Sequence, residues 1–192
     1  MTARKKKKPS VSVRLSEVAQ GVAQQRGMTT KPAAATKSGK LLWKLLEDAL
    51  PSVRTSAAFA LTRARDPALV QAFIAALKGA SSARMAKSAV LLGAAGYVNA
   101  VPYFAAGLQE ALKTDKKLAG ALARGLGLLA DPSVAPLLIE ALESNTVPME
   151  AAEALGRLGD VRAAPALIKA LGHKNESVRA AAAYSLGCLG QL

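Results

Sequence analysis

The stretch that decides the fold is Ala152-Glu153-Ala154-Leu155-Gly156-Arg157-Leu158-Gly159-Asp160, followed by Ala164-Pro165-Ala166-Leu167-Ile168-Lys169-Ala170-Leu171. Related stretches recur along the chain when Gly156 is taken as an anchor. The equivalent anchor positions, separated by 31, 34, 29 and 31 residues, are Thr62, Gly93, Gly127, Gly156 and Gly187. An internal period near 30 residues predicts an array of small, similar structural units.

Five further columns repeat around the anchor. Alanine stands four residues before it, at Ala58, Ala89, Ala123, Ala152 and Ala183. Leucine directly precedes it, at Leu61, Leu92, Leu126, Leu155 and Leu186. Aspartate follows four residues later, at Asp66, Asp131 and Asp160. Proline follows after nine residues, at Pro102, Pro136 and Pro165. Leucine follows after fifteen, at Leu77, Leu108, Leu142 and Leu171.

These columns predict a pair of helices in each unit. The alanine and the leucine before the anchor are three residues apart and share one helical face, and the small alanine lets a neighbouring helix approach. We interpret the anchor glycine, the small residue three positions after it and the aspartate as the turn that ends this first helix. The aspartate then caps a second helix, and the proline lies in its first turns, where a missing N–H costs little.

Composition agrees with an all-α protein. The chain is 51% hydrophobic but only 4% aromatic, and its Ala and Leu favour helices. We therefore predict a right-handed α-solenoid of about 4.5–5 helix pairs over residues 39–192, preceded by a basic disordered tail over residues 1–38. The uncharged stretch from Ser88 to Gln109 fits two short helices and a turn, so no transmembrane segment is expected. The single cysteine, Cys188, excludes an intramolecular disulfide and favours a cytoplasmic location.

The pattern resembles the short HEAT-like repeats of the bacterial type found in phycobilisome lyases. The motifs that carry the resemblance are Ser177-Val178-Arg179, Ala154-Leu155-Gly156 and Pro165-Ala166-Leu167-Ile168-Lys169-Ala170-Leu171. It covers about residues 40–192 and is weaker in the first two copies, where Thr62 replaces the glycine and Tyr97 the aspartate. The resemblance implies stacked helix pairs, and either protein binding or a role as a bilin-lyase-like enzyme or chaperone subunit.

No constellation of residues predicts catalysis. His173 is the only histidine, so it has no partner for metal ligation or base catalysis, and we interpret it as an exposed loop residue. Cys188 is expected to be a half-buried structural thiol. Arg54 and Arg179 each follow a valine and are expected to hold main-chain carbonyls or acids between repeats. We therefore predict a non-enzymatic protein without cofactor or metal.

Two surfaces are predicted to bind protein partners. The first is a row on the second helices, expected to face the concave side, formed by Ala72, Tyr103, Leu137, Glu140, Ala166 and Lys169. The second is the C-terminal end, where the apolar residues Leu186, Leu189 and Leu192 either meet another molecule or a second copy in a homo-oligomer, or merely cap the preceding repeat. The leading interpretation is thus a scaffold or adaptor whose solenoid docks a protein partner.

The charge distribution leaves a second interpretation open. The net charge is +13, and residues 1–40 alone hold ten Lys or Arg against Glu17, a net +9. A basic cluster in the tail, formed by Arg4, Lys5, Lys6, Lys7 and Lys8, would add electrostatic attraction to a protein partner. The same cluster could instead bind nucleic acid, another polyanion or an anionic surface.

If the tail binds a polyanion, removing residues 1–38 abolishes that binding. For the intact chain, affinity should fall by orders of magnitude between about 50 and 200 mM salt, because each neutralised phosphate releases counterions. Fluorescence anisotropy with a labelled oligonucleotide measures both effects. Binding that is insensitive to salt, or that survives the deletion, would contradict this role of the tail.

Overall fold

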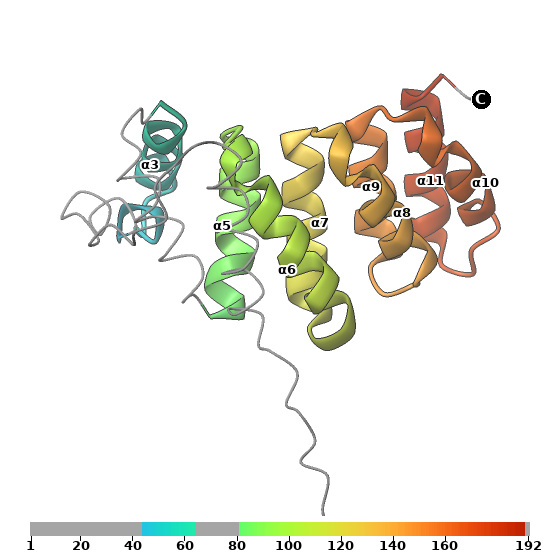
Figure 1. Cartoon of the computed structure of the whole chain (residues 1–192), viewed down its shortest axis with the longest axis horizontal. Coiled ribbons are helices and arrows are strands. Elements are labelled where there is room, and N and C mark those ends of the chain that lie inside the picture. The colour runs from blue at the N-terminus through green and yellow to red at the C-terminus, as the bar shows by residue number, and fades with distance from the viewer. Residues whose placement is uncertain (1–43, 64–80, 191–192) are drawn as a thin grey trace, which may run out of the picture.

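The computed structural model describes residues 44–63 and 81–190 of the chain, and its helices follow one another in a stacked row (Figure 1). The α-helices of the described part are α3 (Pro51–Arg63), α5 (Ser82–Ala94), α6 (Val101–Thr114), α7 (Lys116–Leu129), α8 (Ala135–Glu143), α9 (Pro148–Leu158), α10 (Ala164–Ala170) and α11 (Glu176–Cys188). Three 3₁₀ turns precede α6, α8 and α10: η1 (Val98–Ala100), η2 (Pro132–Val134) and η3 (Val161–Ala163). The part of the chain described here contains no strand, which confirms the all-α solenoid.

The helices form two layers with different packing. The first helices of the repeats, α3, α5, α7, α9 and α11, pack in sequence, and the contacts among the last four are extensive. The second helices α6, α8 and α10 pack mainly on the first helix that follows each of them and touch one another only slightly. The second helices thus form the more loosely packed layer. Their expected place on the concave side stays a prediction.

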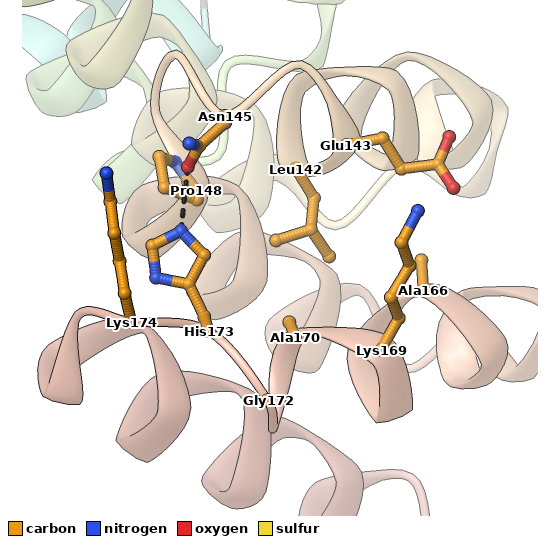
Figure 2. Close-up of a pocket in the computed structure, with 10 residues that line it drawn as sticks. All are labelled: Leu142, Glu143, Asn145, Pro148, Ala166, Lys169, Ala170, Gly172, His173 and Lys174. Atoms are coloured by element: carbon orange, nitrogen blue, oxygen red, sulfur yellow. Dashed lines mark hydrogen bonds between the residues drawn. The ribbon is translucent and has the colours of Figure 1, made fainter.

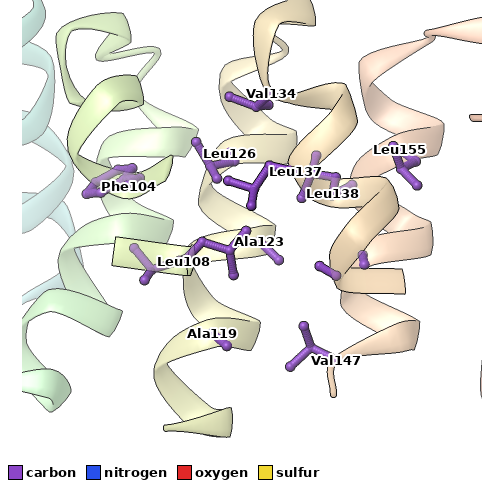
Figure 3. Close-up of a cluster of buried hydrophobic side chains, with 14 of the residues drawn as sticks. Phe104, Leu108, Ala119, Ala123, Leu126, Val134, Leu137, Leu138, Val147 and Leu155 are labelled. Carbon is purple, nitrogen blue, oxygen red and sulfur yellow. The ribbon is translucent and has the colours of Figure 1, made fainter. Parts of the chain in front are cut away.

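Leucines of the repeat columns fill the space between the layers. Leu92, Leu126, Leu155 and Leu186 directly precede the anchors and are fully buried. They meet apolar side chains of the second helices, including Phe104, Leu108 and Leu138, in one continuous core (Figure 3). Each helix pair therefore shares its apolar stripe with its neighbours, as expected for units that cannot bury that stripe alone.

The predicted aspartate caps stand one short element earlier than expected, on the 3₁₀ turns η2 and η3 that lead into α8 and α10. The Asp131 and Asp160 side chains accept hydrogen bonds from the main-chain N–H groups of Ser133 and Arg162, each at 2.9 Å. Prolines occupy the first turn of the second helices. The stretch from Ser88 to Gln109 divides into α5, η1 and α6, and no helix of the described ranges is long and apolar enough to cross a membrane.

The anchor glycines have a different role from the predicted turn. Gly93, Gly127 and Gly156 lie inside α5, α7 and α9, where the next first helix comes into main-chain contact. A Cβ atom at Gly127 would lie 2.6 Å from Cα of Ala154, and one at Gly93 would lie 2.6 Å from the carbonyl oxygen of Gly125. Neither distance allows a side chain. The anchor column thus serves helix stacking, and the turn belongs to the column three residues later.

That later column adopts the left-handed conformation in every described repeat. The φ angles are 73° at Gly96, 50° at Ala130, 70° at Gly159 and 64° at Gly190. Glycine adopts this conformation freely, whereas a residue with a Cβ atom is destabilised there by about 1–2 kcal/mol in conformational free energy. Ala130 is the member of the column that carries this strain.

Replacing Gly127 with alanine should lower the free energy of unfolding by about 1–3 kcal/mol, because α9 must move to admit the new methyl group. Urea unfolding followed by circular dichroism measures the change. The matched control is Gly187→Ala, at the equivalent position of α11, where the residue is exposed and alanine should be neutral or stabilise by up to about 1 kcal/mol. Equal effects of the two substitutions would contradict the close-contact role.

Replacing Ala130 with glycine should raise the free energy of unfolding by about 0.5–1 kcal/mol, because relief of the left-handed strain exceeds the added chain entropy of glycine. The reciprocal change, Gly159→Ala, should destabilise the chain by a similar amount. Thermal and urea unfolding of both variants test the pair. A loss of stability in Ala130→Gly would show that the turn does not carry this strain.

Candidate functional site

The candidate site lies in the layer of second helices, in two grooves between successive members of that layer. One groove, between α6 and α8, has a volume of about 450 Å³, and the other, between α8 and α10, about 440 Å³. The two grooves overlap at three equivalent repeat positions, and the second one extends further, to the loops that follow α8 and α10. The second helices touch one another only slightly and leave these grooves open, whereas the glycine contacts close the layer of first helices.

The groove between α6 and α8 has an apolar floor and a polar rim. Leu137, on α8, is 9% exposed and lines it together with Ala105 of α6. Gln109 and Glu140 are exposed and stand on opposite walls. This combination of a few apolar groups with a few polar ones is typical of surfaces that bind peptides.

The groove between α8 and α10 repeats this plan with other side chains (Figure 2). Ala166 and Lys169 of α10 take the positions that Leu137 and Glu140 have on α8, and Glu143 stands where Gln109 stands in the first groove. The equivalent rim positions therefore carry opposite charges, negative at Glu140 and positive at Lys169. A ligand that crossed both grooves would meet this alternation.

His173 fixes one end of this second groove. Its Nε2 lies 2.8 Å from Oδ1 of Asn145, and its Nδ1 accepts a hydrogen bond of 3.0 Å from the N–H of Asn175. Because Nδ1 accepts, Nε2 carries the proton and donates to Asn145 (dashed in Figure 2). The imidazole thus joins the loops of two consecutive repeats, and the histidine is half-buried and not a fully exposed loop residue.

The structure places the other predicted binding residues in different surroundings. Tyr103 is 4% exposed and Ala166 8% exposed, so both contribute mainly to packing, while Glu140 and Lys169 are the accessible members of the row. Ala72 and the tail residues 4–8 lie outside the described residues.

At the C-terminal end, Leu186 of α11 is fully buried and Leu189 is half-buried. Leu192 lies outside the described residues. Cys188 is exposed, which corrects the expectation of a half-buried thiol. It follows that Leu186 acts in the core of the repeat and presents no surface to a partner.

The two predicted structural arginines act as expected. Nη1 of Arg54 donates to the carbonyl oxygens of Asp48 and Ala49 at 2.7 and 2.9 Å. In the equivalent position of α11, Nη1 of Arg179 donates to the carbonyl oxygens of His173 and Lys174 at 2.8 and 3.1 Å. Both arginines therefore hold the chain that leads into a first helix.

Titratable groups with shifted pKa values have structural explanations. Hydrogen bonds from the Arg162 side chain lower the pKa of Asp160, which caps η3. Burial raises the pKa of Tyr97 to about 12. Tyr97 stands where other repeats have the capping aspartate, and its ring is instead part of the core. Neither group lines the two grooves, and the described residues contain no cluster of His, Cys, Asp and Glu that could hold a metal ion.

Sequence reasoning missed a row of surface residues on the first helices. The position three residues before the anchor holds Val90, Arg124, Glu153 and Tyr184. Tyr184 is 73% exposed. Nη1 of Arg124 lies 3.6 Å from Oε1 of Glu150, which belongs to the next first helix, α9. The sequence contains a signal for this row. The residue type at this position changes from repeat to repeat, whereas the columns on either side of it are constant, and exposed positions typically vary in this way.

Comparison with known proteins agrees with this architecture. The HEAT-repeat family matches residues 105–187. A solved structure described as the complex of CpcE and CpcF of phycocyanin lyase from Nostoc sp. PCC7120 is similar, with a TM-score of 0.61 and 27% sequence identity. That match covers 86% of this chain and 70% of the other chain. The search of curated proteins gave no match. The repeat columns, the stacked helices and these two similarities together show that the chain is a HEAT-like repeat protein.

Proposed function

We propose that the chain is a non-catalytic scaffold or adaptor of the cytoplasm that binds a segment of a protein partner in the grooves between its second helices. The observation that carries the proposal is that grooves in consecutive repeats share an apolar position, Leu137 or Ala166, and a charged rim position, Glu140 or Lys169. Repeats of this kind give a partner several small binding sites in a row, so modest contacts add up.

The rim charges define the partner segment. Glu140 favours a basic residue in the groove between α6 and α8, and Lys169 favours an acidic residue in the groove between α8 and α10. The apolar floors favour small aliphatic side chains between these two. The basic tail, by its composition, would add long-range attraction to a partner with acidic surroundings.

The similar phycocyanin lyase structure favours a second candidate, in which the chain acts as a subunit of a bilin-lyase-like complex. That structure is described as a complex of two proteins, which also supports protein partners for this chain. The two candidates differ in whether a chromophore is involved. Absorbance and fluorescence of the purified chain and of its complexes, with added bilin, separate them.

Reversing the charge at Glu140 or Lys169 should reduce partner binding by about three- to tenfold, because each side chain stands on the rim of a groove and is exposed. The variants are Glu140→Lys and Lys169→Glu. Quantitative affinity capture from the native cell identifies the partner, and titration of each variant with that partner then measures the affinity. The free energy of unfolding of both variants should lie within about 0.5 kcal/mol of the wild-type value, because substitutions of exposed residues change it little.

The control variant is Arg157→Glu, which makes the same kind of change on an exposed residue of α9 that lines neither groove. Its partner binding should equal that of the wild type. Unchanged capture by both groove variants would reject the grooves as the binding surface. Salt-dependent capture that requires only residues 1–38 would favour the polyanion interpretation.

A further inference from the structure

The crossing between α3 and α5 departs from the packing of the later first helices. From α5 to α11, a small residue two positions before the anchor lies against the preceding helix, as Ala154 lies against Gly127. On α5 that position holds Leu91, and the sequence of α3 has Thr62 in place of the anchor glycine. Since both residues are larger, the same close approach is not available, and α3 and α5 touch one another only slightly.

A cavity of about 620 Å³ lies beside this crossing. Helix α5 forms one wall, and residues 46–49 and Arg54 of α3 form the other. Five residues that are spaced along one face of α5 line the cavity: Arg84, Lys87, Ser88, Leu91 and Ala94. The volume lies within the range of about 300–1,000 Å³ that is typical of small-molecule sites.

Ser88 is the group in this cavity that the repeat pattern does not explain. Five residues before the anchor, the other first helices have the buried apolar residues Ala57, Leu122, Ala151 and Ala182. Ser88 is itself only 6% exposed, and its hydroxyl makes no hydrogen bond within the described part of the chain. A buried hydroxyl without a partner costs free energy, which a ligand atom that accepts its hydrogen bond would recover.

The charged groups gather at one end of the cavity. Arg84 and Lys87 lie near the N-terminal end of α5, and Arg54 lies near that of α3. Arg84 forms an ion pair with Glu47, whereas Lys87 has no ion-pair partner among the residues that the structure describes. Three cationic and two carboxylate side chains line the cavity, so the lining has a net charge of +1.

The remainder of the lining is mainly apolar. Leu91 and Ala94 continue the same face of α5 toward its C-terminal end, and Leu46, which is 6% exposed, belongs to the other wall. A ligand that lay along α5 would therefore have its charged group near Lys87 and its hydrocarbon part near Leu91.

We propose that this cavity binds a small amphipathic carboxylic acid. The carboxylate pairs with Lys87 and accepts a hydrogen bond from Ser88, while the aliphatic part lies on Leu46 and Leu91. One carboxylate balances the excess positive charge of the lining, and the apolar end selects a ligand with a hydrocarbon chain. The cavity is separate from the grooves between the second helices, so the two proposals can fail independently.

The test is calorimetric titration of the full chain with sodium decanoate, below the concentration at which it forms micelles. Binding should be saturable, with one site per chain. Lys87→Met keeps the length of the side chain but removes its charge, and it should weaken binding at least about tenfold. Ser88→Ala should weaken binding about three- to tenfold. It should leave the melting temperature unchanged or raise it, because most other first helices have alanine at this position.

Three controls separate a specific site from general affinity for amphiphiles. Lys117→Met removes an exposed cation of α7 that does not line the cavity, and it should leave decanoate binding unchanged. Decan-1-ol, which is uncharged, should bind the wild-type chain and Lys87→Met equally. Ala94→Phe should fill the apolar end and weaken the binding of both compounds. Absence of saturable decanoate binding, equal decanoate affinities of Lys87→Met and the wild type, or a lower melting temperature of Ser88→Ala would overturn the proposal.

Discussion

The close approach of consecutive first helices is the constraint on which the rest of the molecule depends. At Gly93, Gly127 and Gly156 the next helix comes so near that a single methyl group would overlap it. This brings the first helices together, whereas α6, α8 and α10 touch one another only slightly. The difference in packing between the two layers leaves the grooves between the second helices open. The glycines of the anchor column thus influence the packing of both layers.

The sequence was sufficient for the architecture and for most of the local structure. The columns of Leu, Asp and Pro have direct physical meanings as core, cap and first-turn residues, and the structure confirms these roles at Leu155, Asp160 and Pro165. The role of the anchor glycine was wrongly interpreted, because a glycine near a helix end can serve either a turn or a close contact. Only the position of the neighbouring helix distinguishes these two uses.

The candidate site was less predictable for a related reason. Spacing along a helix shows which residues share a face, but it does not show which layer of a two-layer array is the wider one. Glu140 and Lys169 were identified and do stand on groove rims. Tyr103 was grouped with them by register, yet it is buried, because side chains at the same register meet different neighbours in different repeats. The hydrogen bond between His173 and Asn145 joins residues 28 apart, and no local pattern indicates it.

The most direct test of this account is the measurement of nuclear Overhauser effects across the first-helix crossings in protein with labelled glycine, alanine and serine. Strong effects should join the Hα protons of Gly127 to the methyl group of Ala154, and those of Gly156 to the Hβ protons of Ser185. These contacts follow directly from main-chain proximity at the anchors. Their absence, with both helices assigned and helical, would contradict the claim that the glycine column holds the array together.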